Sequence, residues 1–258
     1  MTSPAFPTAD TTLLLPGPTG PLELAVDHAD TDAAAMAVIC IVCHPLPTEG
    51  GSMHNKVVTM AARSLRELGL TTIRFNFRGT GASAGSFDHG LGELDDLRAV
   101  AAWVRRQRPD ASLWLCGFSF GAFVSLRGAA ELQPAALISI APPAGRWDFD
   151  DIATPMMPWL VVQGEDDEIV DPQAVYAWLA RVAAERPGTE PSLVRMPDTT
   201  HFFHRKLMDL RGAIKHWARS YLPGQHVPAS PPPQLGVPDQ GMPAQGMPAQ
   251  GTPDQGTH

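Results

Sequence analysis

The chain has 258 residues, of which 44% are hydrophobic and 18% are charged, so it has enough apolar surface to fold without metal or disulfide staples. Its net charge of -8 and its scattered Lys and Arg residues exclude the basic footprint of a nucleic-acid-binding protein. The first residues lack a basic start with an apolar run, and no apolar run is long enough to cross a membrane, so we expect a cytoplasmic protein without a membrane partner.

Short apolar runs alternate with helical patterns over the first 222 residues. The apolar runs predict eight strands, at residues 12–15, 22–26, 37–43, 71–77, 112–116, 136–140, 159–162 and 192–196. Apolar spacing near 3.6 predicts helices at residues 56–68, 91–106, 119–131, 172–184 and 205–221. The first two strands are short and are separated by Pro16-Gly17-Pro18, which favours an antiparallel edge. The pattern predicts an α/β fold with a mostly parallel eight-stranded sheet and helices on both faces.

The composition of the chain changes near Leu222. Beyond it a five-residue unit recurs as VPDQG, MPAQG, MPAQG and TPDQG, without any run that could build a core. We therefore expect one folded domain at residues 1–222 and a disordered Pro/Gln/Gly-rich repetitive tail at residues 223–258. The tail is either a solvated appendage or a segment that binds a partner.

Three cysteines, Cys40, Cys43 and Cys116, lie in apolar strand-like runs. Cys40 and Cys43 match the C-x-x-C pattern of redox pairs, but such a pair needs an exposed turn before a helix, and this one lies within AVICIVC. We expect reduced, buried thiols.

A five-residue motif directly follows the strand-like run SLWLC. Gly117-Phe118-Ser119-Phe120-Gly121 is a G-x-S-x-G sequence that leads into a predicted helix. In this motif a sharp strand-to-helix turn holds the serine in a strained conformation, and the glycines leave room for neighbouring backbone. The helix N-terminus adds a positive dipole where an oxyanion would form. We predict that Ser119 is a nucleophile; the alternative is a serine that only caps the helix.

A serine nucleophile needs a base that takes its proton and an acid that orients the base. After such an elbow the acid follows a late strand. The run WLVV leads into acidic residues, and Asp167 has G-x-x-D-x-x-V spacing between Gly164 and Val170. Asp167 is the predicted acid and Asp166 the second choice. The remaining acidic residues of this turn, Glu165, Asp166 and Glu168, are expected to lie in solvent.

Two histidines follow the last predicted strand, SLVRM. His201 comes sooner after the strand and precedes two apolar residues that can anchor the loop, so it is preferred over His204 as the base. A metal pair is the other interpretation, but no third ligand stands at a diagnostic spacing, so we expect no metal.

Backbone N–H groups must also stabilise the oxyanion of a tetrahedral intermediate. Phe120 supplies one, because it follows the nucleophile. The run AVICIVC ends in His44-Pro45-Leu46-Pro47, and proline has no N–H, so Leu46 is the predicted second donor. We expect His44 to orient this loop.

Four stretches together resemble the small single-domain α/β-hydrolases of bacteria, described as predicted hydrolases or dienelactone-hydrolase-like serine esterases: CHPLPTEGGSMHNKVV, IRFNFRGTGASAGSFDHGLGEL, GFSFGAF, and VVQGEDDEIVDP with DTTHFFHRKL. The resemblance runs from Leu13 to about Tyr221 and implies the α/β-hydrolase fold with a Ser119, Asp167 and His201 triad. The family's early loop usually reads H-P-H-P and then D-N-K. Here Leu46 and His54 replace the second histidine and the aspartate. Arg78 stands in the family's R-G-x-G turn, where a structural anchor is expected.

The residues between the strands ALISI and WLVV are too few for a helical cap, so the pocket should be open and shallow. Trp147, Phe149, Met156 and Met157 are candidates to line an acyl site. We expect a carboxylesterase-like serine hydrolase that acts on small or short-acyl carboxylic esters through an acyl-enzyme and without a cofactor. The alternatives are a thioesterase or peptidase with the same triad and a non-catalytic binding module or scaffold. A homo-oligomer is compatible with the sequence.

Overall fold

The structure, a computed structural model, describes residues 3–30 and 38–222. The chain divides into two units, residues 1–226 and 227–258. The second unit and the repetitive segment at 223–258 lie outside the described residues, and the predicted disordered tail lies there too. Among the described residues no helix is both long and apolar enough to cross a membrane.

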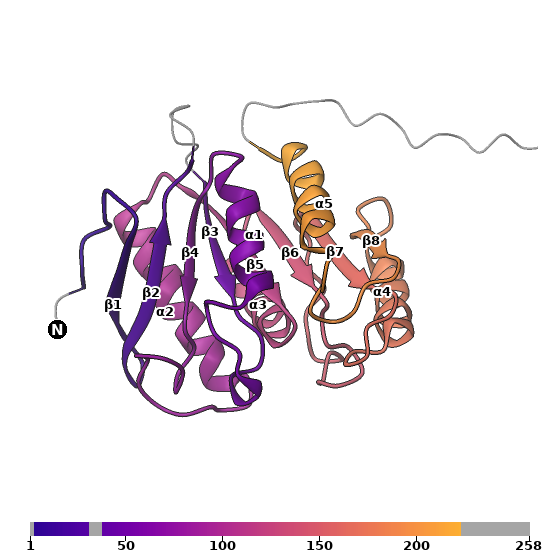
Figure 1. Cartoon of the computed structure of the whole chain (residues 1–258), viewed down its shortest axis with the longest axis horizontal. Coiled ribbons are helices and arrows are strands. Elements are labelled where there is room, and N and C mark those ends of the chain that lie inside the picture. Colours follow the sequence, from indigo (N-terminus) through magenta and orange to yellow (C-terminus); the bar gives the residue numbers. More distant parts are fainter. Residues whose placement is uncertain (1–2, 31–37, 223–258) are drawn as a thin grey trace, which may run out of the picture. The chain divides into compact units, whose positions relative to one another are not determined.

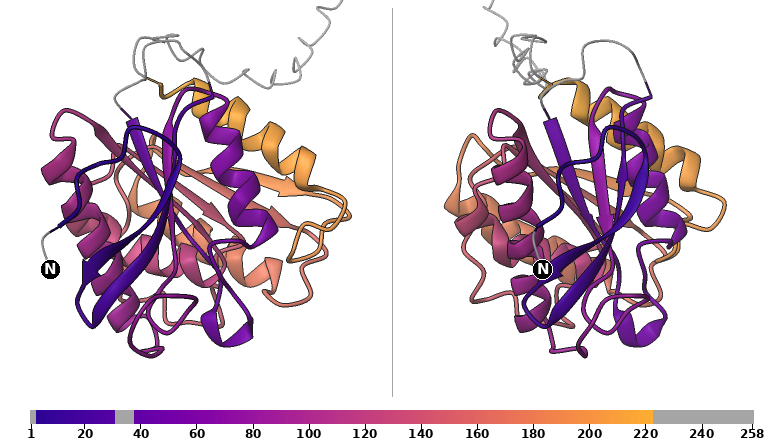
Figure 2. Two further views of the ribbon diagram at one scale, coloured as in Figure 1. Left: turned by 60° about the vertical axis from the view of Figure 1, so that its left-hand side comes forward. Right: turned by 90° about the vertical axis from the view of Figure 1, so that its left-hand side faces the viewer.

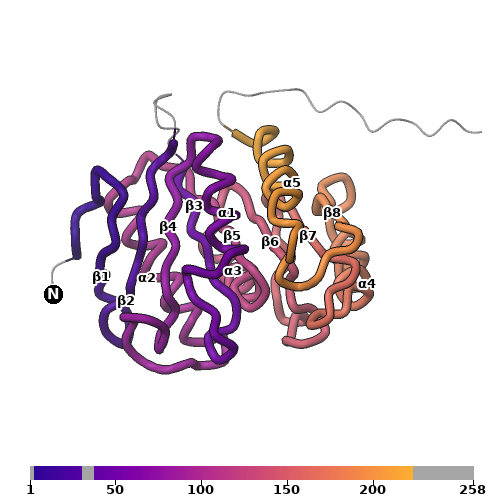
Figure 3. The backbone as a smooth tube through the Cα atoms, viewed as in Figure 1, coloured from indigo at the N-terminus to yellow at the C-terminus, as the bar shows by residue number. Residues whose placement is uncertain are grey.

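One twisted sheet runs through the first unit, with its strands in the order β1-β2-β4-β3-β5-β6-β7-β8 (Figures 1 and 3). The strands are β1 (Thr11–Gly17), β2 (Gly20–Asp27), β3 (Val38–Cys43), β4 (Thr71–Phe75), β5 (Ser112–Phe118), β6 (Ala136–Ile140), β7 (Trp159–Gly164) and β8 (Ser192–Met196). β2 is antiparallel to both of its neighbours, and every other pair after it is parallel. The central strand β3, VICIVC, is buried at every residue, as expected for a parallel strand covered on both faces.

Among the described residues five α-helices cover the two faces of this sheet: α1 (Lys56–Arg66), α2 (Leu91–Gln107), α3 (Phe120–Leu132), α4 (Pro172–Glu185) and α5 (Leu207–Arg219). α1 and α5 pack on one face and α2, α3 and α4 on the other, so the side chains of the sheet divide between two hydrophobic clusters (Figure 2). The predicted α/β architecture with helices on both faces is therefore confirmed. The residues between β6 and β7 form a loop and no helical cap.

Most elements begin or end one or two residues away from the predicted bounds, and two of these differences have a clear structural reason. β1 continues through Pro16 and Gly17, which pair with Pro21 and Gly20, so the turn is only Pro18-Thr19. A proline is accommodated there because β1 is an edge strand. β4 ends at Phe75, two residues earlier than expected, because the next two residues turn away to make loop contacts.

Two helices, α1 and α4, begin with side-chain caps that the sequence provides. The Asn55 side chain accepts a hydrogen bond from the N–H of Val57 at the start of α1, and Asp171 accepts one from Gln173 at the start of α4. These caps fix the points at which the loops leave the carboxyl ends of the parallel strands. In open α/β sheets that edge is where ligands bind.

Candidate active site

Ser119 stands at the sharp turn between β5 and α3. Its φ and ψ are 53° and -121°, on the positive-φ side that residues other than glycine rarely adopt. The N–H of Ser119 donates a 2.8 Å hydrogen bond to the carbonyl oxygen of Ile140 at the end of β6. The turn is thus the strained one that the motif predicted, and the neighbouring strand holds it.

Two glycines let this turn close against its surroundings. A Cβ atom at Gly117 would lie 2.3 Å from the carbonyl oxygen of Gly121. A Cβ atom at Gly121 would lie 2.3 Å from the carbonyl oxygen of Cys43, at the end of β3. Real Cβ atoms do not approach so closely, so the N-terminus of α3 packs directly against the strand from which the Leu46 loop departs.

The three residues predicted to act together form a continuous chain of hydrogen bonds. Nε2 of His201 lies 3.0 Å from Oγ of Ser119, and Nδ1 lies 2.8 Å from Oδ2 of Asp167. An ionised carboxylate can only accept, so Nδ1 carries the proton and donates it to Asp167. The lone pair of Nε2 then faces the serine hydroxyl, as a general base requires. Asp166 and His204, the second choices, lie exposed outside this chain.

The carboxylate of Asp167 is held in its ionised form. Burial alone would raise its pKa, but the hydrogen bond and the charge of His201 act in the opposite direction. The N–H groups of Ile169 and Val170 also donate to Oδ1, at 2.9 and 2.7 Å. Together these interactions hold the pKa of Asp167 below its usual value.

Contacts that the sequence did not reveal join the acid loop to the histidine loop. The N–H of His201 donates a 3.1 Å hydrogen bond to Oε2 of Glu168, a residue expected only to lie in solvent. The Glu168 side chain is indeed exposed, but it ties the base to the loop that carries the acid. Backbone bonds from Glu165 to Met196 and from Asp166 to Thr199 run alongside.

Gln163 supports the acid from the strand below it. This buried side chain on β7 donates from Nε2 to Oδ2 of Asp167 at 3.1 Å. Sequence reasoning missed it, although a glutamine at the end of the apolar run WLVV was a usable signal, because a buried amide needs hydrogen-bond partners.

The two predicted oxyanion donors lie at the same pocket as Ser119. Within the described part of the chain, the N–H groups of Leu46 and Phe120 donate to no other group. The carbonyl of Leu46 accepts hydrogen bonds from the N–H groups of Glu49 and Gly51, at 3.2 and 3.0 Å, which fixes the peptide planes of the loop. Two amides are thus available for a ligand beside the serine.

His44 is completely buried beneath this loop. Its Nε2 accepts a 3.0 Å hydrogen bond from the N–H of Phe77, and its Nδ1 donates to the carbonyl of Pro45 at 2.6 Å. Burial lowers the pKa of His44 to about 4, although the bond to Pro45 opposes this shift. His44 is therefore a neutral link between two loops, in line with the orienting role expected for it.

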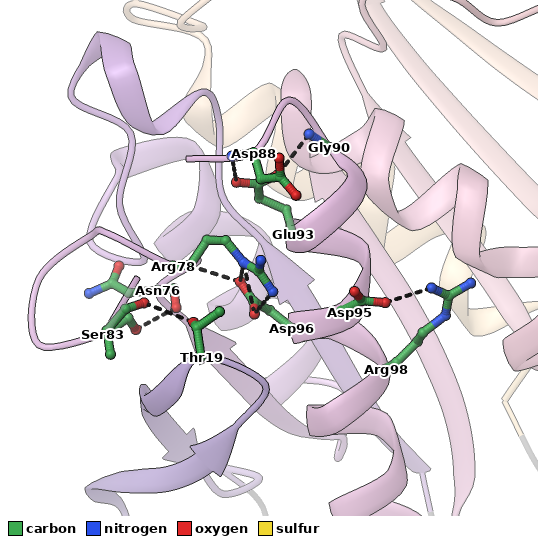
Figure 4. Close-up of polar contacts among 11 residues, drawn as sticks. Thr19, Asn76, Arg78, Ser83, Asp88, Gly90, Glu93, Asp95, Asp96 and Arg98 are labelled. Atoms are coloured by element: carbon green, nitrogen blue, oxygen red, sulfur yellow. Dashed lines mark hydrogen bonds and ion pairs between the residues drawn. The ribbon is translucent and has the colours of Figure 1, made fainter. Parts of the chain in front are cut away.

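Arg78 is paired inside the fold and does not line the pocket (Figure 4). Its guanidinium donates to the fully buried carboxylate of Asp96 on α2, with a shortest distance of 2.8 Å, and its own N–H donates to the same carboxylate. Nearby, Glu93 accepts from the N–H groups of Asp88 and Gly90, which caps α2. These bonds anchor the loop after β4, as expected for Arg78.

The pocket at Ser119 has a volume of about 410 Å³ and is lined mainly by loops at the carboxyl ends of the strands. Its walls include Leu46, Trp147, Ile169 and Phe202, with Glu49 and Arg146 as charged residues. Of the four candidates named for an acyl site, only Trp147 lines this pocket. The other three do not, since Phe149 is buried, Met157 packs on the core and Met156 is exposed.

The three cysteines are buried and unpaired with one another. Burial raises the pKa of the Cys40 and Cys43 thiols well above the usual value, which disfavours the thiolate that redox chemistry needs. In residues 3–30 and 38–222 no three His, Cys, Asp or Glu side chains converge as a metal site would require.

Comparison with known proteins identifies similar chains. The family model of X-Pro dipeptidyl-peptidase (S15 family) matches residues 47–157. The uncharacterized protein RP471 of Rickettsia prowazekii is 32% identical over 206 residues, which span 78% of this chain and 85% of that protein.

Solved structures give closer matches. The protein XC6422 from Xanthomonas campestris, a lidless α/β serine hydrolase, is 67% identical, with a TM-score of 0.81 over 86% of this chain and 99% of that one. An α/β serine hydrolase homologue from Coxiella burnetii is 40% identical, with a TM-score of 0.77 over 82% of this chain and 99% of that one. Both matches extend over nearly the whole of the relative. The chain belongs to the α/β serine hydrolases.

Proposed function

We propose that this serine hydrolase cleaves small or short-acyl carboxylic esters through a Ser119-His201-Asp167 triad. The observation that carries the proposal is the unbroken chain of hydrogen bonds from Asp167 through His201 to Ser119. Ser119 faces a pocket of mixed apolar and polar lining, over which the described residues form no helical cap. The oriented base and the strained serine are what acyl transfer requires, and neither is needed by a scaffold.

In the first half of the reaction, Ser119 Oγ attacks the ester carbonyl while Nε2 of His201 takes the hydroxyl proton. Asp167 stabilises the imidazolium that forms. The oxyanion of the tetrahedral intermediate binds the N–H groups of Leu46 and Phe120. His201 then gives its proton to the leaving alcohol, and the acyl group remains on Ser119.

In the second half, a water molecule attacks the acyl-enzyme with His201 again as the base. Collapse of the second tetrahedral intermediate releases the acid and restores the Ser119 hydroxyl. Water has access to this intermediate, because no helical cap covers the pocket in the part of the chain that the structure describes. No cofactor takes part in this sequence of steps.

The size and lining of the pocket support a short acyl group. A volume of about 410 Å³ is near the lower end of the range of roughly 300–1,000 Å³ for small-molecule sites. Leu46, Trp147 and Ile169 offer apolar surface close to Ser119. A short alkyl chain or a small ring fits such walls better than a charged acyl group does.

The proposal is tested with p-nitrophenyl esters from acetate to octanoate, compared between the wild type and Ser119→Ala. We expect a short-chain optimum and a fall in kcat of about 10⁴-fold or more in the variant. Matched acyl thioesters in the same assay separate an esterase from a thioesterase by their kcat/KM values. Folded wild-type protein that hydrolyses none of these substrates would contradict the proposal.

A peptidase is the second candidate, favoured by the match of residues 47–157 to X-Pro dipeptidyl-peptidase. Such an enzyme must hold the substrate's amino terminus, and Glu49 is the acidic residue among those that line the pocket. Hydrolysis of Ala-Pro-p-nitroanilide with a kcat/KM above that for the esters, lost in Glu49→Gln but not in Glu165→Gln, would favour this candidate.

A further inference from the structure

Trp147 forms a wall between the pocket at Ser119 and a second cavity. The second cavity has a volume of about 550 Å³ and lies beside α4, with Phe149, Ala174, Ala177 and Trp178 among its lining residues. Within the described residues, Trp147 is the one residue that lines both cavities. The two cavities therefore meet at Trp147.

The indole is held in place by two aromatic contacts. Its ring centroid lies 5.0 Å from that of Phe120, which follows the nucleophile, and 5.1 Å from that of Phe123 on α3. The backbone N–H of Trp147 donates a 3.2 Å hydrogen bond to the carbonyl of Pro143, and the side chain of the neighbouring Arg146 donates at 2.9 Å to the carbonyl of Ile169. A half-buried ring with two aromatic contacts on a hydrogen-bonded loop acts as a wall.

The orientation of a bound ester places its acyl group away from the base. The leaving oxygen must face Nε2 of His201, because that atom supplies its proton. The acyl chain then extends toward a pocket wall away from His201. Trp147 is part of such a wall, because it lines the pocket and packs on Phe120 beside the serine.

The second cavity suits the end of a longer alkyl chain. Phe149 and Trp178 pack edge to face at 4.8 Å and give it a buried aromatic floor. Three charged residues line it, Asp148, Asp150 and Arg181, and all lie at its exposed rim. Asp150 and Arg181 form an ion pair with each other at 3.2 Å, and Asp148 accepts a 3.0 Å hydrogen bond from the N–H of Asp150. A chain that passed the indole would find apolar surface.

We propose that Trp147 determines acyl-chain specificity by closing the pocket at Ser119 to chains that would otherwise reach the second cavity. This inference rests on the proposed ester hydrolysis. Removal of the indole joins the two cavities, so the chain-length optimum moves to longer acyl groups. A hydrophobic pocket discriminates by about 10–200-fold per methylene at most, which sets the scale of the effect.

The test measures kcat/KM for p-nitrophenyl acetate, butyrate, hexanoate and octanoate with the wild type, Trp147→Ala, Trp147→Val and Trp147→Phe. Trp147→Val keeps an apolar contact with Phe120 in case Trp147→Ala fails to fold, and thermal unfolding checks every variant. We expect the octanoate-to-acetate ratio to rise by at least about 10-fold in the Ala and Val variants, mainly through KM for octanoate, and to change little in Trp147→Phe.

A second substitution refills the joined cavity. Ala177 is exposed on α4 and lines the second cavity but not the pocket at Ser119. Ala177→Trp should therefore leave the acyl-chain preference of the wild type unchanged. In the Trp147→Ala background it should reverse the rise in the octanoate-to-acetate ratio. If the wild type cleaves short esters and the folded Ala and Val variants keep its acyl-chain preference, the inference about Trp147 is overturned but the proposed function is not. A wild type that cleaves no ester would overturn the proposed function and the inference with it.

Discussion

The N–H of Phe77 donates a 3.0 Å hydrogen bond to the buried Nε2 of His44. This bond joins the segment after β4 to the segment after β3, and the other ring nitrogen of His44 holds the carbonyl of Pro45. The same planar peptide group carries the N–H of Leu46. A histidine that never touches the substrate therefore fixes the position of a predicted oxyanion donor.

Replacement of His44 by Gln should lower kcat for p-nitrophenyl acetate by about 10–100-fold with little change in KM. Glutamine reaches only one of the two partners, so the Leu46 amide loses its fixed position, and an oxyanion donor is worth about 10²–10³-fold. Steady-state kinetics at pH 8 measures the effect. An unchanged kcat would show that the loop holds its geometry without the ring.

The same residue makes stability depend on pH. In the unfolded chain His44 takes up a proton near its usual pKa of 6.5, whereas the folded protein resists protonation until about pH 4. Stability is therefore full above pH 6.5 and falls as pH decreases toward 4, by about 3 kcal/mol from this group. Urea unfolding at pH 7 and pH 4.5 should show a larger loss in the wild type than in His44→Gln. Equal losses would contradict the assignment.

Glu168 should raise kcat by holding the backbone of His201 in place through a hydrogen bond. Glu168→Ala removes the acceptor and allows the histidine loop to shift, so we expect kcat to fall by about 10-fold with KM nearly unchanged. Glu168→Gln keeps an acceptor oxygen and should recover most of the activity. Glu165→Ala, in the same acidic turn and without a side-chain bond to His201, serves as the matched control and should behave like the wild type.

The close approach of α3 to β3 predicts a large effect from one methyl group. Gly121→Ala would place Cβ 2.3 Å from the carbonyl oxygen of Cys43, so the helix must move and stability should fall by about 1–3 kcal/mol, with loss of activity. Gly212→Ala on α5 meets no atom within 4 Å and should raise stability by about 0.5–1 kcal/mol. Chemical denaturation measures the free energy of unfolding of both variants. Equal values for Gly121→Ala and Gly212→Ala would show that the turn at Ser119 can relax, which would contradict the prediction.

Loss of the buried ion pair beneath the loop after β4 should lower the free energy of unfolding more than loss of an exposed ion pair beside it. Asp96→Ala leaves the Arg78 guanidinium buried without its partner and should cost about 3–5 kcal/mol. Asp95→Ala, one residue earlier on the same helix, breaks an exposed pair with Arg98 and should cost less than about 1 kcal/mol. Similar free energies of unfolding for the two variants would contradict the assignment of Arg78 as an anchor.

The strands and helices of this chain could be predicted from the sequence because their signals are local. The same holds for the three residues of the hydrogen-bonded chain from Ser119 through His201 to Asp167. An apolar run, a helical period and a G-x-S-x-G elbow are each readable within about 15 residues, and the fold order then indicates where Asp167 and His201 must lie. The extension of β1 through Pro16 was missed because only the pairing shows that β1 is an edge strand.

The contacts that tune the site depend on tertiary geometry, which the sequence does not display. Glu168 looks like any exposed acid until the histidine loop, 33 residues later, brings the N–H of His201 to it. Phe149 looks like a pocket residue, yet it packs on Phe123 and Trp178 and lines a different cavity. Composition and spacing cannot tell which of two neighbouring cavities an aromatic side chain lines.

Covalent labelling tests directly whether Ser119 is an activated nucleophile. Purified wild-type protein is treated with a fluorophosphonate, and its intact mass and the modified residue are determined by mass spectrometry, with Ser119→Ala and His201→Ala as controls. We expect one phosphonyl group per chain on Ser119, none in Ser119→Ala and strongly slowed labelling in His201→Ala. Folded wild-type protein that stays unlabelled, or that is labelled equally in Ser119→Ala, would contradict it.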